Sequence, residues 1–555
     1  MRKQETPLVI DRELKAKHRR SRRYAGRRTL WKITSDKACR GCGRTLMDPE
    51  TGVVFARTAE GTAIALGLLK CGRIWFCPVC SAKIRHGRGQ EVTKAVVSWI
   101  KRGGQAYLVT FAARHAHAHA LADLMDAIQG SRSGTKEEIQ AARAAVAEAK
   151  AAVEDAGARA KAAVQAARIS APKGAKRKAM AHAKAAATVA VDAAQARLDA
   201  ARAELAATTR QAGAYQRLIT GGAWAGNEGR GTEGIRLGIG YVGMIRATEV
   251  TVGQGNGWHP HIHAIVLVGG AVGCSTGDDR APVVADTFEP SAEALAKWET
   301  HWRSVWTSHL ERIDPTFRPS DACLIPGCKC QGKGHGVDFK RLETVQDAKA
   351  MGDYLAKTQD GKDPANELTR GDLKSGRQGN MTPFQALGRI GDLMGGVPEE
   401  DADGHGSLGW LLALWAEYES AMSGRRAIEW TRHLRPLLGL DGGDTEDDDL
   451  DVLFELDAAH DFRDGVQIQE RAWHKITGKA LDLAVVEAVE GDELQDDVVT
   501  ALAVQAGSVA GSVRRLTAEE VTAVAEAAAA KLAERREVAA ERRRKEREQA
   551  RRSDS

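Results

Sequence analysis

The sequence predicts an α+β protein with a central antiparallel sheet and flanking helices. Three observations indicate this class. Strand-like runs at 106–111, 236–252 and 261–268 are separated by turn or helical segments. Two Cys-x-x-Cys pairs precede the first run. Between residues 135 and 211 the chain is dominated by Ala, Glu, Lys, Arg and Gln, which favour helix.

Length and charge suggest several structural units and a polyanionic partner. At 555 residues the chain exceeds one ordinary core, and its formal net charge is +6. Residues 1–35 hold twelve Lys and Arg against three Asp and Glu, and the C-terminal stretch from Lys531 to Arg552 is also dense in basic residues. Such segments contact phosphate backbones or form solvated helix faces. No apolar run reaches the roughly 18–20 residues of a membrane span, and the N-terminus has no signal-peptide pattern. We therefore expect a cytoplasmic protein without a membrane partner, whose nine cysteines are metal ligands rather than disulfides.

Composition shifts divide the chain into seven expected segments. These are a basic N-terminal arm (1–35), a zinc-ribbon module (36–90), the first part of the sheet domain (91–134), an Ala-rich helical hairpin insertion (135–211), the second part of the sheet domain (212–440), an acidic linker with a small C-terminal region (441–515) and a charged basic C-terminal helix (516–555).

Within the insertion, Ser170–Gly174 is the single cluster of helix breakers, so we expect two long helices joined by a turn. The segment has almost no large apolar stripe and should project from the domain. Further along, Trp298, Trp302 and Trp306 are four residues apart, which favours a buried helix face over base stacking.

The most informative run is His259-Pro260-His261-Ile262-His263. Side chains alternate along a strand, so His261 and His263 share one face while Ile262 points to the core. Two imidazoles on one face can hold a divalent ion, which needs at least one more ligand. The simpler alternative is a polar sheet face. His259 shares the face but lies at the strand entry, and we interpret it as a supporting residue.

The preceding strand offers the third ligand. If residues 253–257 form a hairpin centred on Gly255, Glu249 lies directly opposite His261, with the Cβ atoms roughly 5 Å apart. A slip of one residue would turn it to the other face. A carboxylate beside two imidazoles suits Mg²⁺ or Mn²⁺, because hard cations prefer oxygen ligands.

A helical pattern around 349–357 places Tyr354 and Lys357 on one face. The ordinary tyrosine pKa of about 10 makes the hydroxyl a weak nucleophile. A metal on the attacked phosphate and a nearby ammonium would help it react. Alone, a helical tyrosine is more often a packing residue.

The cysteines suggest structural zinc. Cys39-x-x-Cys42 and Cys77-x-x-Cys80 have the form of a zinc ribbon, which leaves Cys71 unassigned. A second, irregular set is a weaker candidate for zinc. It consists of Cys323, Cys328, Cys330 and His335. The alternating His115, His117 and His119 are not assigned as ligands.

Taken in order, these motifs resemble the replication initiators of rolling-circle plasmids and related integrative elements, within the HUH endonuclease superfamily. The resemblance covers about residues 36–440 apart from the insertion. It is carried by Cys77–Cys80, by Leu108–Phe111 with Arg114-His115, by Asn256–His263, by Tyr354–Lys357, and by the downstream segments Asp372–Arg377 and Ser423–Arg426.

The resemblance implies an HUH endonuclease palm, with the histidines on the central sheet and the tyrosine on a facing helix. It implies that Tyr354 attacks single-stranded DNA at a plasmid origin, remains linked to the 5′ end and frees a 3′ hydroxyl that primes rolling-circle replication. A host helicase and polymerase would then act as partners. One departure is Ala350, where some relatives have a glutamate linked to termination.

Other functions remain open. An HUH transposase or conjugative relaxase would use the same chemistry. A non-catalytic zinc-ribbon regulator would bind DNA with structural histidines. Metal-dependent nicking separates the enzymes from the regulator.

Overall fold

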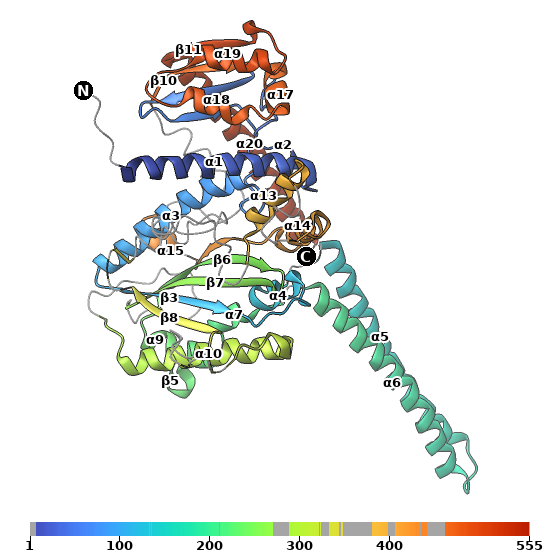
Figure 1. Cartoon of the computed structure of the whole chain (residues 1–555). Helices are drawn as coiled ribbons and strands as arrows, with labels where there is room; N and C mark the ends of the chain where they lie inside the picture. Colours follow the sequence, from blue (N-terminus) through green and yellow to red (C-terminus); the bar gives the residue numbers. More distant parts are fainter. Residues whose placement is uncertain are drawn as a thin grey trace.

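A computed structural model shows two larger antiparallel sheets on opposite sides of a long helix, a two-stranded sheet of β4 (Gly226–Asn227) and β5 (Thr232–Glu233), and a helical hairpin that projects from the domain of the lower sheet (Figure 1). The α+β class with antiparallel sheets is therefore confirmed. Among the described residues, no helix is long and apolar enough to cross a membrane. The structure describes residues 7–131, 134, 136–209, 211–269, 288–320, 322–323, 332, 334–342, 344, 346–347, 380–397, 406–432, 434–440 and 461–553.

The larger sheet has five strands in the order β8-β3-β7-β6-β9, and every neighbouring pair is antiparallel. The strands are β3 (Gln105–Ala112), β6 (Gly243–Gly253), β7 (Gly257–Val268), β8 (Val337–Leu342) and β9 (Ile428–Trp430). The strand expected from residue 236 begins only at Gly243, because a helical turn, α9 (Ile235–Gly238), precedes it.

Helices cover both faces of this sheet (Figure 1). On one face, α10 (Ala292–Ile313) packs Trp302 and Trp306 against Phe111 of β3, with ring centroids 5.7 and 4.9 Å apart. The tryptophans are buried, as the sequence predicted. On the other face lie α3 (Pro78–Lys101) and α13 (Pro383–Met394).

The smaller sheet joins the two ends of the chain. Its order is β11-β10-β1-β2, and Val53 of β1 pairs with Ile468 of β10. The strands are β1 (Val53–Thr58), β2 (Ala63–Leu66), β10 (Phe462–Ile468) and β11 (Val513–Thr517). Three helices complete the core of this unit: α17 (Glu470–Gly478), α18 (Asp482–Val489) and α19 (Asp496–Gln505).

This pairing corrects the expected division of the chain. The separate zinc-ribbon module at 36–90 and the small region at 441–515 instead share one sheet and one core, as far as the described residues go. The expected boundary at residue 90 also falls inside α3, which continues to Lys101. No local sequence signal marks a strand pairing between segments so far apart.

The basic N-terminal arm is a helix, α1 (Pro7–Ile33), that lies between the two sheets (Figure 1). Arg27 and Arg28 each donate a 2.7 Å hydrogen bond to Asp482 at the start of α18. The Asp482 side chain is fully buried, so this ion-paired contact fastens α1 to the smaller sheet unit.

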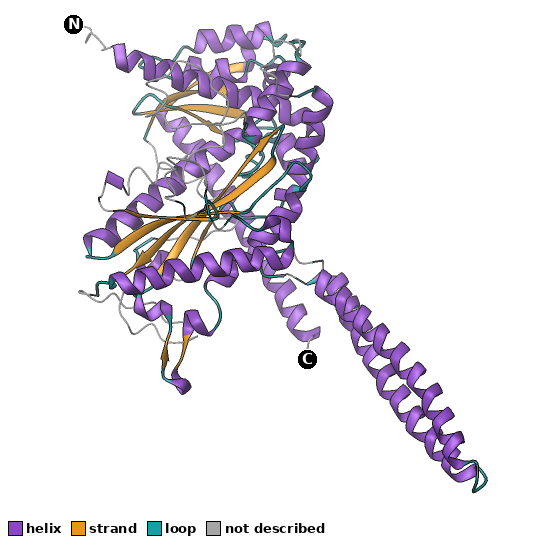
Figure 2. Cartoon of the chain, turned by 60° about the horizontal axis from the view of Figure 1, so that its bottom comes forward, coloured by secondary structure: helices purple, strands orange, loops and turns teal. Residues whose placement is uncertain are grey.

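The insertion forms the expected antiparallel pair, α5 (Lys136–Ser170) and α6 (Lys176–Thr208), and both views show it projecting into solvent (Figures 1 and 2). The expected C-terminal helix is α20 (Ala518–Ser553). The remaining α-helices and strands of the described chain are α2 (Lys37–Gly41), α4 (Leu121–Gln129), α7 (Ala214–Leu218), α8 (Gly222–Ala225), β4 (Gly226–Asn227), β5 (Thr232–Glu233), α14 (Leu408–Met422) and α15 (Leu434–Leu437).

Candidate metal centres

The β6–β7 hairpin places a carboxylate opposite the histidine strand. Its register pairs Glu249 with His261, as predicted from a turn centred on Gly255. His261 and His263 follow the strand alternation onto one face, and Ile262 between them is fully buried. Phe111, which packs against α10, pairs with Ile262, so the histidines lie on the face away from α10.

The three side chains converge. The Oε2 atom of Glu249 lies 3.2 Å from Nε2 of His263 and 3.8 Å from Nε2 of His261. One ligand atom from each residue lies within 4.8 Å of the others, a spacing that a single ion can bridge. The Glu249 side chain is 40 % exposed, so the group can be reached from solvent.

Hydrogen bonds orient both imidazoles. Nδ1–H of His261 donates to the carbonyl oxygen of His259 at 3.2 Å, because a carbonyl can only accept. The Nε2 lone pair of His261 therefore faces Glu249. Nδ1 of His263 lies 3.0 Å from the Thr110 hydroxyl of β3, which can accept its proton in the same way. Metal-ligating histidines usually have such a partner on the second ring nitrogen.

The protonation states suit a cation. Burial, together with the neighbouring His263, lowers the pKa of His261 to about 4. Burial raises the pKa of Glu249, but the adjacent imidazoles of His263 and His261 outweigh burial and lower that pKa to about 2. A neutral His261 beside an ionised carboxylate is the state that binds a divalent ion, so these residues fit one.

Two neighbours of this group were missed from the sequence. His115 stacks on His259 with ring centroids 4.3 Å apart, and its Nδ1 donates to the Asn256 carbonyl at 2.9 Å. Its place just after the β3 strand, in the first motif, was the available signal. Buried Arg85 of α3 is close enough to help lower the pKa of Glu249. Nothing in the sequence pattern connects α3 with that carboxylate.

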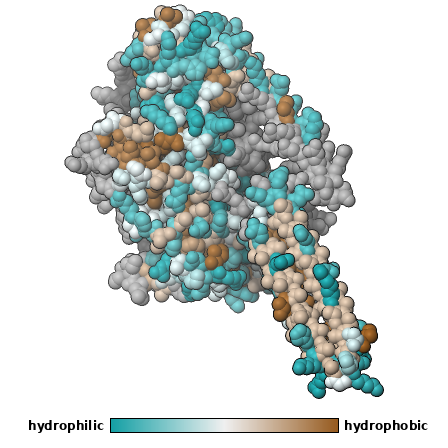
Figure 3. Space-filling model, turned by 90° about the vertical axis from the view of Figure 1, so that its right-hand side faces the viewer, coloured by the Kyte–Doolittle hydropathy of each residue, from teal (hydrophilic) through white to brown (hydrophobic). Residues whose placement is uncertain are grey.

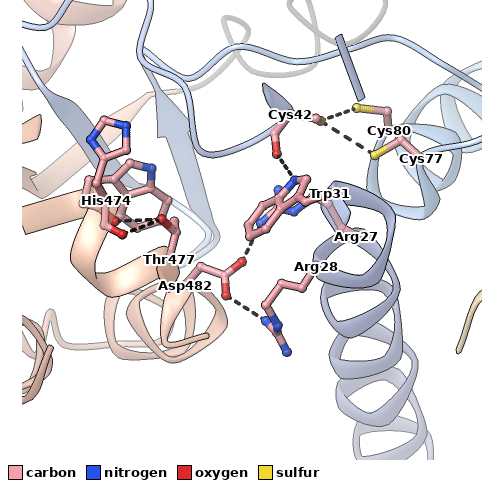
Figure 4. A network of polar contacts seen from close by, with 10 residues as sticks. Arg27, Arg28, Trp31, Cys42, Cys77, Cys80, His474, Thr477 and Asp482 are labelled. Carbon is pink, nitrogen blue, oxygen red and sulfur yellow. Dashed lines mark hydrogen bonds and ion pairs between the residues drawn. The ribbon is translucent and has the colours of Figure 1, made fainter. Parts of the chain in front are cut away.

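The cysteines gather in a second, buried group between α2, the loop after β2 and the start of α3. Figure 4 shows three of them, Cys42, Cys77 and Cys80. The Cys42 sulfur lies 3.7 Å from Cys77 and 3.5 Å from Cys80, and Cys71 lies 3.7 Å from Cys80. These four ligand atoms all lie within 4.8 Å of one another. Four buried sulfurs at this spacing fit a tetrahedral soft cation such as Zn²⁺.

This set differs from the expected one, which contained Cys39 and omitted Cys71. The loop after β2 folds back on the first cysteine pair: Gly43 donates to the Leu69 carbonyl, and Leu69 donates to Thr45, each at 2.8 Å. That contact brings Cys71 into the group. Cys39 is buried beside it and hydrogen bonds to Cys71.

The thiols and lysines of this region shift one another's pKa values. Hydrogen bonds from Cys42, Cys71 and Cys77 lower the pKa of the Cys80 thiol, which favours a thiolate there. Burial lowers the pKa of Lys70 to about 7, and the Cys80 charge opposes that shift. A cationic Lys70 would therefore offset part of the negative charge of a thiolate site.

The other expected site residues are only partly described. Nε2 of His335 lies 3.0 Å from the Cys323 sulfur, while Cys328 and Cys330 lie outside the described residues. Tyr354 and Lys357 also lie outside them. The described chain leaves the larger sheet at Leu342 and returns at Met381, whose backbone pairs with Val252, three residues after Glu249.

The downstream Arg-rich segment is partly structural. Arg425 is buried, pairs with Asp126, and donates to the Gly130 carbonyl at 3.2 Å, which ties the end of α14 to the end of α4. These buried contacts give Arg425 a packing role that does not require contact with DNA.

Fold and sites thus define an α+β protein with a His-His-Glu group on its central antiparallel sheet and a buried four-cysteine cluster at the N-terminal side. The chain is 49 % identical over 458 residues to the protein rep of Streptomyces lividans, across 81 % of this chain and 82 % of the relative. It is 40 % identical over 516 residues to a neomycin resistance protein of Streptomyces cyanogenus, across 90 % of this chain and 97 % of the relative. The chain therefore belongs to the family of the Streptomyces lividans protein rep. No family model matches it, and no solved structure matches it significantly.

Proposed function

We propose that this protein initiates rolling-circle replication of a plasmid by nicking one DNA strand at the origin. The observation that carries the proposal is the group formed by Glu249, His261 and His263 on paired strands, with the Nε2 atom of His261 presented to the carboxylate. The relative named protein rep supports a role in plasmid replication. The five-stranded antiparallel sheet is compatible with an HUH palm.

The proposed chemistry is a phosphoryl transfer to tyrosine. A divalent ion such as Mg²⁺ or Mn²⁺, bound by the three residues, would neutralise charge on the attacked phosphate. The Tyr354 hydroxyl loses its proton to solvent and its oxygen forms a bond to phosphorus; the bond from phosphorus to the 3′ oxygen breaks, and that oxygen takes up a proton from solvent. Lys357 stabilises the phenolate before the attack. The products are a 5′-phosphotyrosine and a 3′ hydroxyl that primes synthesis by host enzymes.

The sheet geometry supports this reaction because it fixes the metal ligands before DNA arrives. His263 and Thr110 come from adjacent strands, and Glu249 comes from the next, so the ligand positions depend on the sheet and not on a loop. The cysteine cluster, with structural Zn²⁺, would hold the start of α3, which carries Arg85 toward Glu249. A host helicase and polymerase would extend the new 3′ end.

The second relative's name concerns neomycin resistance. The site described here combines two imidazoles with one carboxylate, a set that suits a divalent metal ion. An HUH transposase or conjugative relaxase would share the chemistry, and its DNA substrates would differ.

The test is the covalent adduct. The parent protein should nick single-stranded plasmid DNA with Mg²⁺ or Mn²⁺ and remain linked to the 5′ end. Tyr354→Phe should bind DNA and form no adduct, because the attacking oxygen is lost. Tyr107→Phe is the matched control, since Tyr107 packs against Trp298 on the α10 face. Normal adduct yield in Tyr354→Phe would identify another nucleophile. A parent without metal-dependent nicking would contradict the function.

A further inference from the structure

The helical hairpin is the feature that the proposed chemistry leaves unused. Its longer helix, α5, has 35 residues, so the arm extends about 50 Å from the sheet domain. Figures 1 and 2 show that it projects alone from two viewing angles. Ordering an arm of this length costs conformational entropy. The sheet domain does not cover the surface of the arm.

Charge is distributed unevenly along the arm. Its distal half, residues 156–191, has eight Lys and Arg and no Asp or Glu. The two segments nearest the domain, 136–155 and 192–208, together have five Lys and Arg and eight Asp and Glu. The arm therefore changes from net acidic at its base to strongly basic toward its tip. The eight basic residues are Arg159, Lys161, Arg168, Lys173, Lys176, Arg177, Lys178 and Lys184.

These cations are available to a partner. Arg159 pairs with Asp155, and within the described chain no ion pair engages the other seven. Six of those seven side chains are exposed, and Lys176 is half-buried. Figure 3 shows hydrophilic residues toward the end of an arm whose remaining surface is largely the pale tan of alanine. The small alanine side chains between the cations let a broad, stiff polymer approach the helices closely.

Spacing along the helices suits an extended polyanion. Lys161 and Arg168 are seven residues apart, as are Arg177 and Lys184, so each pair lies on one helix face about 10 Å apart along the axis. Duplex DNA presents a negative charge about every 1.7 Å of its axis, so a basic surface of this length meets several phosphates. Contacts from Lys and Arg to phosphate oxygens carry no sequence information, so binding through this surface should not depend on the DNA sequence.

We propose that the distal half of the α5–α6 arm binds the phosphate backbone of duplex DNA beside the nicking site. The partner class, DNA, rests on the proposed function. The acidic base of the arm repels the same DNA and leaves the tip as the point of contact. The arm thereby holds the duplex at a distance from the sheet, where the single strand is cut.

The experiment compares two variants of the full-length protein with equal loss of charge. The distal variant carries Lys161→Gln, Arg168→Gln, Arg177→Gln and Lys184→Gln. The proximal control carries Arg143→Gln, Lys150→Gln, Arg197→Gln and Arg202→Gln, all on the same two helices and all exposed. Glutamine has nearly the helix propensity of Lys and Arg, so both variants should keep the hairpin, which circular dichroism checks.

Binding to a duplex of about 40 base pairs and arbitrary sequence is measured across a salt series. We expect the distal variant to bind at least tenfold more weakly at about 0.15 M salt, with a salt slope lower by about 2 to 4, since each lost phosphate contact removes about 0.9. The proximal control should bind as the parent does. Equal weakening in both variants, or none in either, would overturn the proposal.

Two parallel measurements distinguish duplex binding from nicking and from attachment to a membrane. Nicking of a single-stranded oligonucleotide should be unchanged in the distal variant. If the parent does not nick but the distal variant still loses duplex binding, the proposed function fails and the DNA contact stands. Anionic vesicles of phosphatidylglycerol and phosphatidylcholine give the other comparison. Loss of vesicle binding with full duplex binding would identify a membrane surface and refute the DNA assignment.

Discussion

Thr110→Val tests whether the sheet positions the proposed metal ligands. The Thr110 hydroxyl lies 3.0 Å from Nδ1 of His263, and valine keeps the shape of threonine without the oxygen. The substitution should leave β3 paired with β7, because the backbone hydrogen bonds and the β propensity of the position are preserved. What is lost is the partner that fixes the His263 ring with Nε2 toward Glu249.

The magnitude follows from burial at the two ends of this hydrogen bond. Loss of a hydrogen-bond partner behind a metal ligand typically weakens metal binding by about 10- to 100-fold. His263 is buried, which would favour the upper end of that range, since an unsatisfied buried donor costs about 1–3 kcal/mol. Thr110, however, is only half-buried, so water can replace part of the bond. We therefore expect a dissociation constant for Mn²⁺ that is about tenfold higher, or about 1.4 kcal/mol.

The assay is a calorimetric Mn²⁺ titration of the purified protein, followed by a metal titration of nicking. Thr251→Val is the matched control: Thr251 is a half-buried strand threonine opposite His259. It should bind Mn²⁺ like the parent. If Thr110→Val also titrates like the parent while its melting temperature is unchanged, the hydrogen bond does not position His263, and the proposed ligand geometry is wrong.

Three other substitutions test the remaining structure. Cys71→Ser should release zinc and destabilise the N-terminal region, whereas Cys39→Ser should retain most of the zinc. Elemental analysis of the purified variants measures the zinc content. Loss of zinc in Cys39→Ser but not in Cys71→Ser would support the ligand set expected from sequence. Ile262→Ala should lower the free energy of unfolding by about 2–5 kcal/mol in denaturant melts, because the side chain is fully buried; a smaller loss with weakened metal binding would mean that the strand has shifted. Asp482→Ala should lower the free energy of unfolding by about 3–5 kcal/mol, because the buried Arg27 guanidinium loses this partner. An unchanged denaturant midpoint would show that other contacts hold α1.

The β6–β7 hairpin was predictable because its signals are local. Alternation along 259–263 gives the faces, and the glycine-rich turn at 253–257 fixes the register that brings Glu249 to His261. The Ala-rich hairpin was predictable for the same reason, since composition and one Pro-Gly breaker specify two helices and a turn.

What was missed depends on distant contacts. The pairing of β1 with β10 joins segments about 400 residues apart, and neither strand carries a mark of its partner. Cys71 enters its cluster through a backbone contact between Gly43 and Leu69, which cysteine spacing does not encode. Arg85 approaches Glu249 only because α3 crosses the sheet on that face.

The shared sheet of β1, β2, β10 and β11 has a consequence for synthesis on the ribosome. The β1–β2 hairpin emerges early, but its partner β10 follows about 400 residues later, which takes about 20–80 s at bacterial elongation rates. During that interval the edge of β1 that will pair with β10 is open, and an isolated hairpin is only marginally stable. A chain that stops before residue 462 never closes this edge. Products of interrupted translation would therefore expose an unpaired strand that chaperones and proteases can recognise, while finished chains hide it.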